Sequence, residues 1–116
     1  MGDIQIEQLA KTSTTWGGAQ LPAYLEGNPE VTILQFTIPP KAKLPMHKHP
    51  VINAGVLLKG KLTVQTKCGK EKTFSAGEPI VEVVEQWHFG RNDEDEPAVL
   101  LMVYAGTAGS EITIKE

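Results

Sequence analysis

The feature of this chain that most constrains its fold is the recurrence of short β-type runs between turn signals. The runs are rich in β-branched and aromatic residues, and no segment shows a sustained apolar stripe with the 3.6-residue period of a helix. The pattern predicts an all-β chain with almost no helix. Ile4, Ile6 and Leu9 suggest one or two early strands, at a sheet edge or in a partner's sheet. The other expected strands cover residues 31–38, 52–58, 61–66, 71–75, 79–84, 87–91, 98–104 and 111–115.

Turn-forming residues separate these runs. Gly69 lies between two alternating runs and tolerates positive φ, so residues 67–70 should close a β-hairpin with Cys68 exposed at its tip. Gly60 predicts a second tight turn. The acidic segment 92–97 is expected to be a solvated connection, because it lacks the ligand and glycine pattern of a calcium-binding EF-hand loop.

The size and composition of the chain fit an ordinary globular protein. Its 116 residues, 41% of them hydrophobic, suit a single domain spanning residues 1–116 with a sizeable core. No apolar run approaches the roughly 20 residues that span a bilayer, and the first residues lack the basic head and apolar stretch of a secretory signal. A single cysteine cannot form an internal disulfide. We therefore expect a cytoplasmic protein.

The charge distribution argues against nucleic acid as a partner. The formal net charge is −3, and the basic residues are scattered instead of forming a stripe. Lys41, Lys43 and Lys48 gather around the histidine segment and could draw a small anion to a site. The simpler interpretation is a surface loop in which lysines flank prolines. We expect neither nucleic acid nor a membrane as a partner.

The three histidines of the chain are its strongest functional signal. His47 and His49 are two residues apart on a predicted strand, so both side chains leave the same side of the backbone, and Asn53 shares their parity. His88 follows much later, after further strands and turns. A lone histidine would be interpreted as a surface group or a hydrogen-bonded core group. Three with no others elsewhere favour a site for one divalent metal ion, formed only on folding.

The same residues carry a resemblance to the cupin superfamily, whose motifs are G-x5-H-x-H-x3,4-E-x6-G and G-x5-P-x-G-x2-H-x3-N. The segment from His47 to Gly60 matches the first motif in spacing, and the segment from Gly77 through His88 to Asn92 matches the second. The chain also resembles small single-domain bacterial cupins. The resemblance implies an antiparallel jelly-roll β-barrel, a three-histidine metal site and a homodimer that pairs or exchanges edge strands.

The chain departs from both motifs at positions that matter for chemistry. The glutamate ligand of the first motif is Asn53 here, and its opening glycine is either absent or replaced by Leu44. In the second motif, Val83 replaces the proline and Glu85 replaces the glycine. Three neutral imidazoles without a carboxylate should hold metal less tightly and polarise a bound anion more strongly. We expect Asn53 to hydrogen-bond a bound water or substrate more often than it coordinates the metal.

Two further carboxylates, Glu82 and Glu85, precede His88 and could stand in for the missing glutamate. Strand parity would put Glu82 on the face of His88, but a turn is expected between them, so both glutamates are predicted to be exposed or to point outward. Trp87 and Phe89 should lie on the opposite face from His88 and pack there.

Two classes of function remain open. The favoured one is a metal-dependent enzyme that uses Fe, Mn, Ni or Zn on a small anionic or chelating substrate, with His47, His49 and His88 as ligands and no residue assigned as general base. Similarity to three-histidine cupins, such as diketone-cleaving and thiol dioxygenases, implies a dioxygenase-type reaction. The alternative is a non-catalytic module in which a metal organises a pocket for a small metabolite or sugar. A silent structural metal is disfavoured, because an ample core does not need one.

Overall fold

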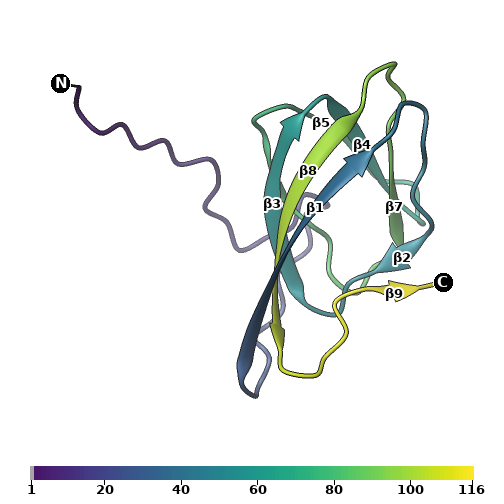
Figure 1. Ribbon diagram of the computed structural model, residues 1–116. Helices are drawn as coiled ribbons and strands as arrows, with labels where there is room; N and C mark the ends of the chain where they lie inside the picture. Colours follow the sequence, from purple (N-terminus) through teal and green to yellow (C-terminus); the bar gives the residue numbers. More distant parts are fainter. Residues whose placement is uncertain (1) are drawn as a thin grey trace.

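The computed structural model describes residues 2–116, and within this range it contains strands and no helix. The strands form two antiparallel sheets, with the orders β1-β8-β3-β6 and β5-β4-β7-β2-β9 (Figure 1). Their bounds are β1 Pro29–Ile38, β2 His47–Lys48, β3 Ile52–Lys59, β4 Lys61–Thr66, β5 Glu71–Ser75, β6 Pro79–Val81, β7 His88–Arg91, β8 Ala98–Thr107 and β9 Ile114–Lys115. None of the described residues belongs to a helix that could cross a membrane.

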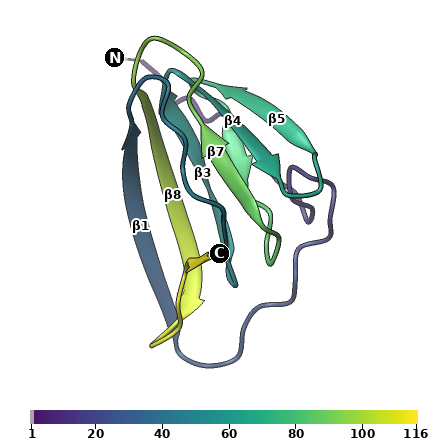
Figure 2. The ribbon, with the colours of Figure 1, turned by 90° about the vertical axis from the view of Figure 1, so that its right-hand side faces the viewer.

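The two sheets lie face to face as layers, with β1, β8 and β3 in one and β7, β4 and β5 in the other (Figure 2). Side chains alternate between core and surface along each strand, which is most regular in β8, where Ala98, Leu100, Met102 and Tyr104 are buried. The predicted all-β jelly-roll fold is confirmed. The barrel needs a correction, because the two sheets are not joined into one closed ring of paired strands.

Most of the strand predictions are confirmed, but two strands are shorter than predicted and the early strands are absent. Strands β4 and β5 have the predicted bounds, whereas β6 ends at Val81 and β9 keeps only two residues. The early strands expected around Ile4 and Ile6 are absent from residues 2–12. The first part of this segment extends away from the sheets (Figure 1), so its backbone has no neighbouring strand with which to pair.

The predicted turns are present. Gly60 joins β3 to β4 with a φ of 80°, and Gly69 has a φ of 100° beside the exposed Cys68. The acidic connection after β7 is solvated as expected, but it is anchored by the buried side chain of Asn92. The amide nitrogen of Asn92 donates to the carbonyl oxygens of Ile38 and Glu96 at 3.1 and 2.7 Å.

Candidate metal centre

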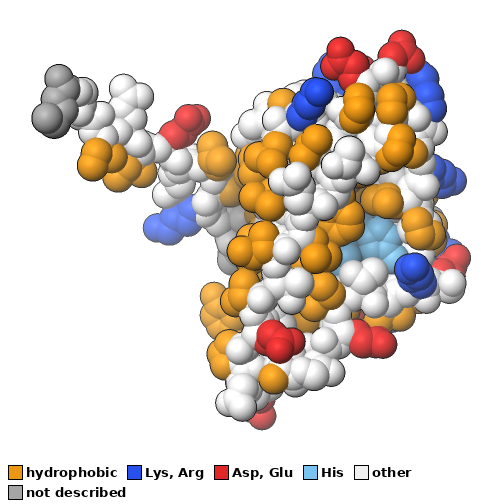
Figure 3. Space-filling view, in the orientation of Figure 1, with side chains coloured by type: hydrophobic (Ala, Val, Ile, Leu, Met, Phe, Trp, Pro, Cys, Tyr) orange, Lys and Arg blue, Asp and Glu red, His pale blue; other side chains and the backbone are white. Residues whose placement is uncertain are grey.

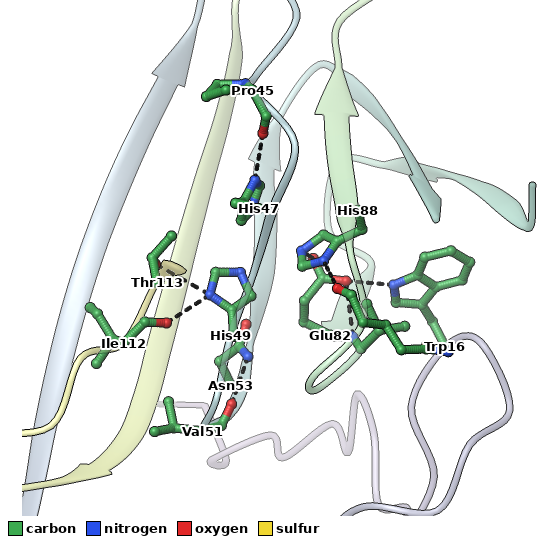
Figure 4. A network of polar contacts seen from close by, with 12 residues as sticks. Trp16, Pro45, His47, His49, Val51, Asn53, Glu82, His88, Ile112 and Thr113 are labelled. Atoms are coloured by element: carbon green, nitrogen blue, oxygen red, sulfur yellow. Dashed lines mark hydrogen bonds and ion pairs between the residues drawn. The ribbon is translucent and has the colours of Figure 1, made fainter. Parts of the chain in front are cut away.

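The three histidines meet between the two layers, where β2 and β7 lie side by side (Figure 4). His47 and His88 are direct partners in the β2–β7 ladder, and His49 follows β2 by one residue. The ring centroids are 4.4 Å apart for His47 and His88, 4.9 Å for His47 and His49, and 5.0 Å for His49 and His88. One nitrogen of each ring lies within 4.8 Å of the other two. Small side-chain rotations bring such atoms to the ~2.1 Å of a metal–imidazole bond.

The backbone orients all three rings in the same way. Each Nδ1 atom contacts a carbonyl oxygen, at 2.7 Å for His47 and Pro45, 2.8 Å for His49 and Ile112, and 2.8 Å for His88 and Gln86. A carbonyl oxygen only accepts, so Nδ1 must carry a proton, and in the neutral ring Nε2 then keeps its lone pair. The Nε2 atom of His88 is buried and has no hydrogen-bond partner among the described residues. These rings therefore fit a metal ion, which would satisfy that lone pair.

Burial keeps two of the rings neutral. His49 and His88 are 4% and 1% exposed. Burial is the main cause that lowers the pKa of each ring to about 4; the neighbouring imidazoles also lower it, and the hydrogen bonds to the carbonyls of Ile112 and Gln86 oppose the shift. Both rings are therefore unprotonated at pH 7, which is the state that coordinates metal.

Asn53 lies near the three histidines, but it is not on the strand that carries His47, as its even spacing from them had suggested. The chain bends at Pro50 and Val51, and β3 delivers Asn53 from the opposite sheet. Its Nδ2 atom donates to the Val51 carbonyl at 3.0 Å, while its buried Oδ1 has no partner among residues 2–116. That oxygen is free to accept a hydrogen bond from a bound water or substrate.

The prediction for Glu82 was wrong. This carboxylate is only 7% exposed, and its Oε2 atom lies 3.7 Å from Nε2 of His88. Its Oε1 atom accepts hydrogen bonds from Nε1 of Trp16 at 2.6 Å and from the backbone N–H of Val83 at 3.0 Å. Burial raises the pKa of Glu82, and those two hydrogen bonds oppose the rise. Glu85 is exposed, as expected, and pairs with Lys48 at 3.6 Å.

The histidines form part of the wall of a cavity of about 240 Å³. Figure 3 shows histidine side chains in a hollow among hydrophobic ones, with a basic side chain at its edge. Most of the wall is apolar, contributed by both sheets through Phe36, Leu44, Leu62, Val64, Leu100 and Met102. The polar lining consists of the three histidines with Asn53, Glu82, Tyr104, Thr113 and Lys115.

The lysines singled out in the sequence do not line this cavity. Lys43 lies over the ring of Phe89 at 4.4 Å, and Lys48 lies over Trp87 at 4.8 Å. Neither aromatic ring lines the cavity, as strand parity predicted. The cation at the cavity is instead Lys115, whose backbone pairs with His47 across β2 and β9.

Sequence reasoning missed Trp16, Tyr104 and Lys115. Tyr104 could have been found, because it continues the alternation of buried residues along β8. Its ring centroid lies 5.4 Å from that of His49, and burial raises its pKa to about 12, so the phenol is neutral at pH 7. Trp16 gave no signal, because it lies in an irregular segment that the fold brings against Val81, whose carbonyl accepts from the Trp16 N–H at 2.9 Å.

The two positions where the cupin motifs have glycine show an unusual backbone conformation in this chain. Counting back from His47 through the five variable positions of the first motif leads to Lys41, not to Leu44. Lys41 has a φ of 61°, and Glu85, at the glycine of the second motif, has a φ of 59°. They are the only non-glycine residues with positive φ among those described. Both positions thus hold non-glycine residues in the left-handed conformation that favours glycine.

Comparison with known proteins agrees with this geometry. The family model of the cupin domain matches residues 34–104. This chain is a cupin. The matched residues contain all three histidines and both motifs of the cupin, as well as Asn53 and Glu82. No curated protein matches the sequence of this cupin.

Solved structures support the same fold. An oxalate oxidase in complex with glycolate is 22% identical, with a TM-score of 0.62 over 73% of this cupin and 45% of that chain. A Klebsiella pneumoniae protein with a double-stranded β-helix domain is 16% identical, with a TM-score of 0.64 over 80% and 88%. The Bacillus subtilis oxalate decarboxylase, described with Mn(II) centres, is 21% identical, with a TM-score of 0.61 over 73% and 23%. This cupin therefore spans less than half the length of the oxalate oxidase.

Proposed function

We propose that this cupin is a metal-dependent enzyme acting on a small anionic or chelating molecule, most specifically by a dioxygenase-type reaction. The observation that carries the proposal is the common orientation of three histidines whose Nε2 lone pairs border one cavity. Imidazole suits divalent Fe, Mn, Ni and Zn, and three protein ligands leave coordination positions open for substrate. When bound, Fe(II) supplies the electron transfer that a reaction with O2 requires.

The volume and lining of the cavity favour a small substrate with a polar end and an apolar body. At about 240 Å³ it lies below the ~300–1,000 Å³ of drug-sized sites. A suitable molecule has a polar, chelating end at the histidines and an apolar body against Leu100 and Met102. Asn53 Oδ1 can accept a hydrogen bond from the polar end, and Lys115 favours an anion at the opening.

The first test measures metal content and O2 uptake together. The protein is loaded anaerobically with Fe(II) and exposed to O2 with small carboxylates, 1,3-diketones or thiols, with Mn, Ni and Zn forms in parallel. We expect at least one substrate class to be consumed with O2. The His88→Ala variant should lose the metal and about 100-fold or more of the activity, because the buried donor is gone. Glu85→Gln is the matched control, since Glu85 is exposed nearby and should leave both unchanged.

The alternative is a non-catalytic metal-organised module that binds a small metabolite or sugar. The same cavity would serve it, because fold and pocket shape do not define chemistry. Saturable binding of a ligand with no product and no O2 uptake, whichever metal is loaded, would favour the module and contradict the enzyme.

We also propose that two copies of the chain form a homodimer. On the edge strand β1, Val31 is 63% exposed and Ile33 is 62% exposed. Ile33 pairs with Val103 of β8, which is 37% exposed. The N-terminal segment adds Ile4 and Ile6, both more than 90% exposed. Adjacent apolar side chains on an edge strand favour cover by a partner. A cytoplasmic location and the lack of nucleic-acid or membrane partners stay predictions from composition.

Light scattering tests the homodimer with two variants of the same strand face. Ile33→Lys should leave a monomer at a concentration where the unmodified chain is dimeric, because a buried lysine would lack a partner. Gln35→Ala, on the same outward face, should remain dimeric because it adds no charge and removes no apolar side chain. A monomeric unmodified chain at that concentration would contradict the proposal.

A further inference from the structure

The three histidines and Asn53 supply no negative charge to balance a bound metal ion. The first cupin motif has a glutamate where this chain has Asn53. Three neutral imidazoles and an amide leave both positive charges of a divalent cation uncompensated in a largely apolar cavity. A carboxylate from elsewhere in the chain would remove one of them.

Glu82 lies beside Asn53, the residue at the glutamate position of the first motif. Strand β6 pairs with β3, with Val81 opposite Ala54. One residue further along, the backbone N–H of Glu82 donates to the carbonyl of Asn53 at 3.0 Å. The two residues are thus neighbours on adjacent chain segments, and both line the cavity with the histidines.

One carboxylate oxygen of Glu82 accepts hydrogen bonds, and the other accepts none from the described residues. Oε1 accepts from Trp16 Nε1 and from the Val83 N–H, which fixes the plane of the group. Oε2 has no hydrogen bond among the described residues and lies 3.7 Å from the unpartnered Nε2 of His88. Figure 4 shows Glu82 between Trp16 and His88. A cation between Oε2 of Glu82 and Nε2 of His88 would accept an electron pair from each of these two atoms.

We propose that Glu82 is the carboxylate of the metal centre, with Oε2 as the fourth protein donor to a divalent cation held by the three histidines. It replaces the motif glutamate from the segment that directly follows β6, and Trp16 is its positioning residue. This inference rests on the proposed metal centre and deepens it. It predicts a site with one negative charge, suited to Mn(II), Fe(II) or Zn(II), although the first motif lacks its carboxylate.

The test compares the affinity for Mn(II) and Zn(II) by calorimetry on metal-free protein. The Glu82→Gln variant keeps an oxygen that can accept from Trp16 and Val83 while removing the charge, so its metal-free melting temperature should not fall. We expect its metal affinity to drop about tenfold or more. Glu85→Gln, three residues away and exposed, is the matched control and should bind as the unmodified chain does.

A double variant tests whether the lost metal affinity comes from the missing carboxylate charge and not from a change in the shape of the site. Adding Asn53→Glu to Glu82→Gln returns a carboxylate to the motif position and should recover most of the lost affinity. The proposal is overturned if Glu82→Gln binds within about twofold of the unmodified chain, or if Asn53→Glu recovers nothing. Binding that requires His88 but not Glu82 would leave the proposed function intact and remove only this inference. No binding by the unmodified chain would remove both.

Discussion

At the scale of single residues, the candidate centre is oriented by main-chain carbonyls. The Nδ1 atoms of His47 and His88 donate to carbonyls two residues before them, those of Pro45 and Gln86. Two unrelated segments thus use the same local geometry to present Nε2. Because the acceptor belongs to the backbone, the side chain of Gln86 can change without altering the tautomer of His88.

Lys41 and Glu85 carry a conformational cost that glycine would relieve. A side chain at a φ near 60° costs about 1 kcal/mol, because Cβ approaches the following carbonyl. Glu85→Gly should therefore raise the free energy of unfolding by up to about 1 kcal/mol. Its ion pair with Lys48 is largely exposed at the Glu85 carboxylate and offsets little of this gain. Urea unfolding measures the change.

The control for this substitution is Glu94→Gly, in an exposed loop where φ is not positive. There, glycine only adds freedom to the unfolded chain, so the free energy of unfolding should fall. Equal destabilisation by both substitutions would show that residue 85 is not strained.

At the scale of elements, the pairing of β3 with its neighbours builds the site. Strand β3 contributes Asn53, and its partner β6 leads directly into Glu82. The opposite neighbour, β8, contributes Tyr104, which pairs with Asn53. Any change that separates β3 from β8 should therefore displace cavity residues from both strands.

Gly55 is the position where this pairing is tightest. A Cβ atom at residue 55 would lie 1.8 Å from the carbonyl oxygen of Leu101, and backbone atoms cannot yield without opening the β3–β8 ladder. Gly55→Ala should lower the free energy of unfolding by about 3 kcal/mol. Gly90→Ala is the matched control, because a Cβ atom there meets only the side chains of Leu44 and Leu62, at 3.4 Å or more. Similar losses in urea unfolding would contradict the argument.

At the scale of the whole molecule, stability depends on pH through the buried rings. Burial lowers the pKa of His49 and His88 to about 4, whereas in the unfolded chain both protonate near 6.5. Between these values the unfolded state binds more protons, so the free energy of unfolding falls as pH falls. Burial raises the pKa of Glu82, so this group makes the free energy of unfolding rise as pH falls. The two histidines outweigh this single carboxylate.

Metal-free protein should therefore lose a few kcal/mol of stability between pH 6.5 and 4.5. Above pH 6.5 these rings are neutral in both states, and their contribution no longer changes. Urea unfolding at a series of pH values measures the slope, and His88→Gln should reduce it by removing one of the two rings. A flat profile over this interval would show that the rings are not held neutral by burial.

Strand periodicity predicted an all-β chain, and the resemblance of the motifs to those of cupins implied the jelly roll and a site that joins His47, His49 and His88. Alternation reports only burial within a strand, so the contact between His47 and the distant His88 was expected from the two motifs together. They could not predict the environment of Glu82, because the β3–β6 register and the passage of Trp16 against Val81 depend on contacts between distant segments. For the same reason, Lys115 lines the cavity while the lysines beside the histidines pack on aromatic rings outside it. The tertiary structure thus decided which charges surround the histidines, since pairing between strands sets those neighbours.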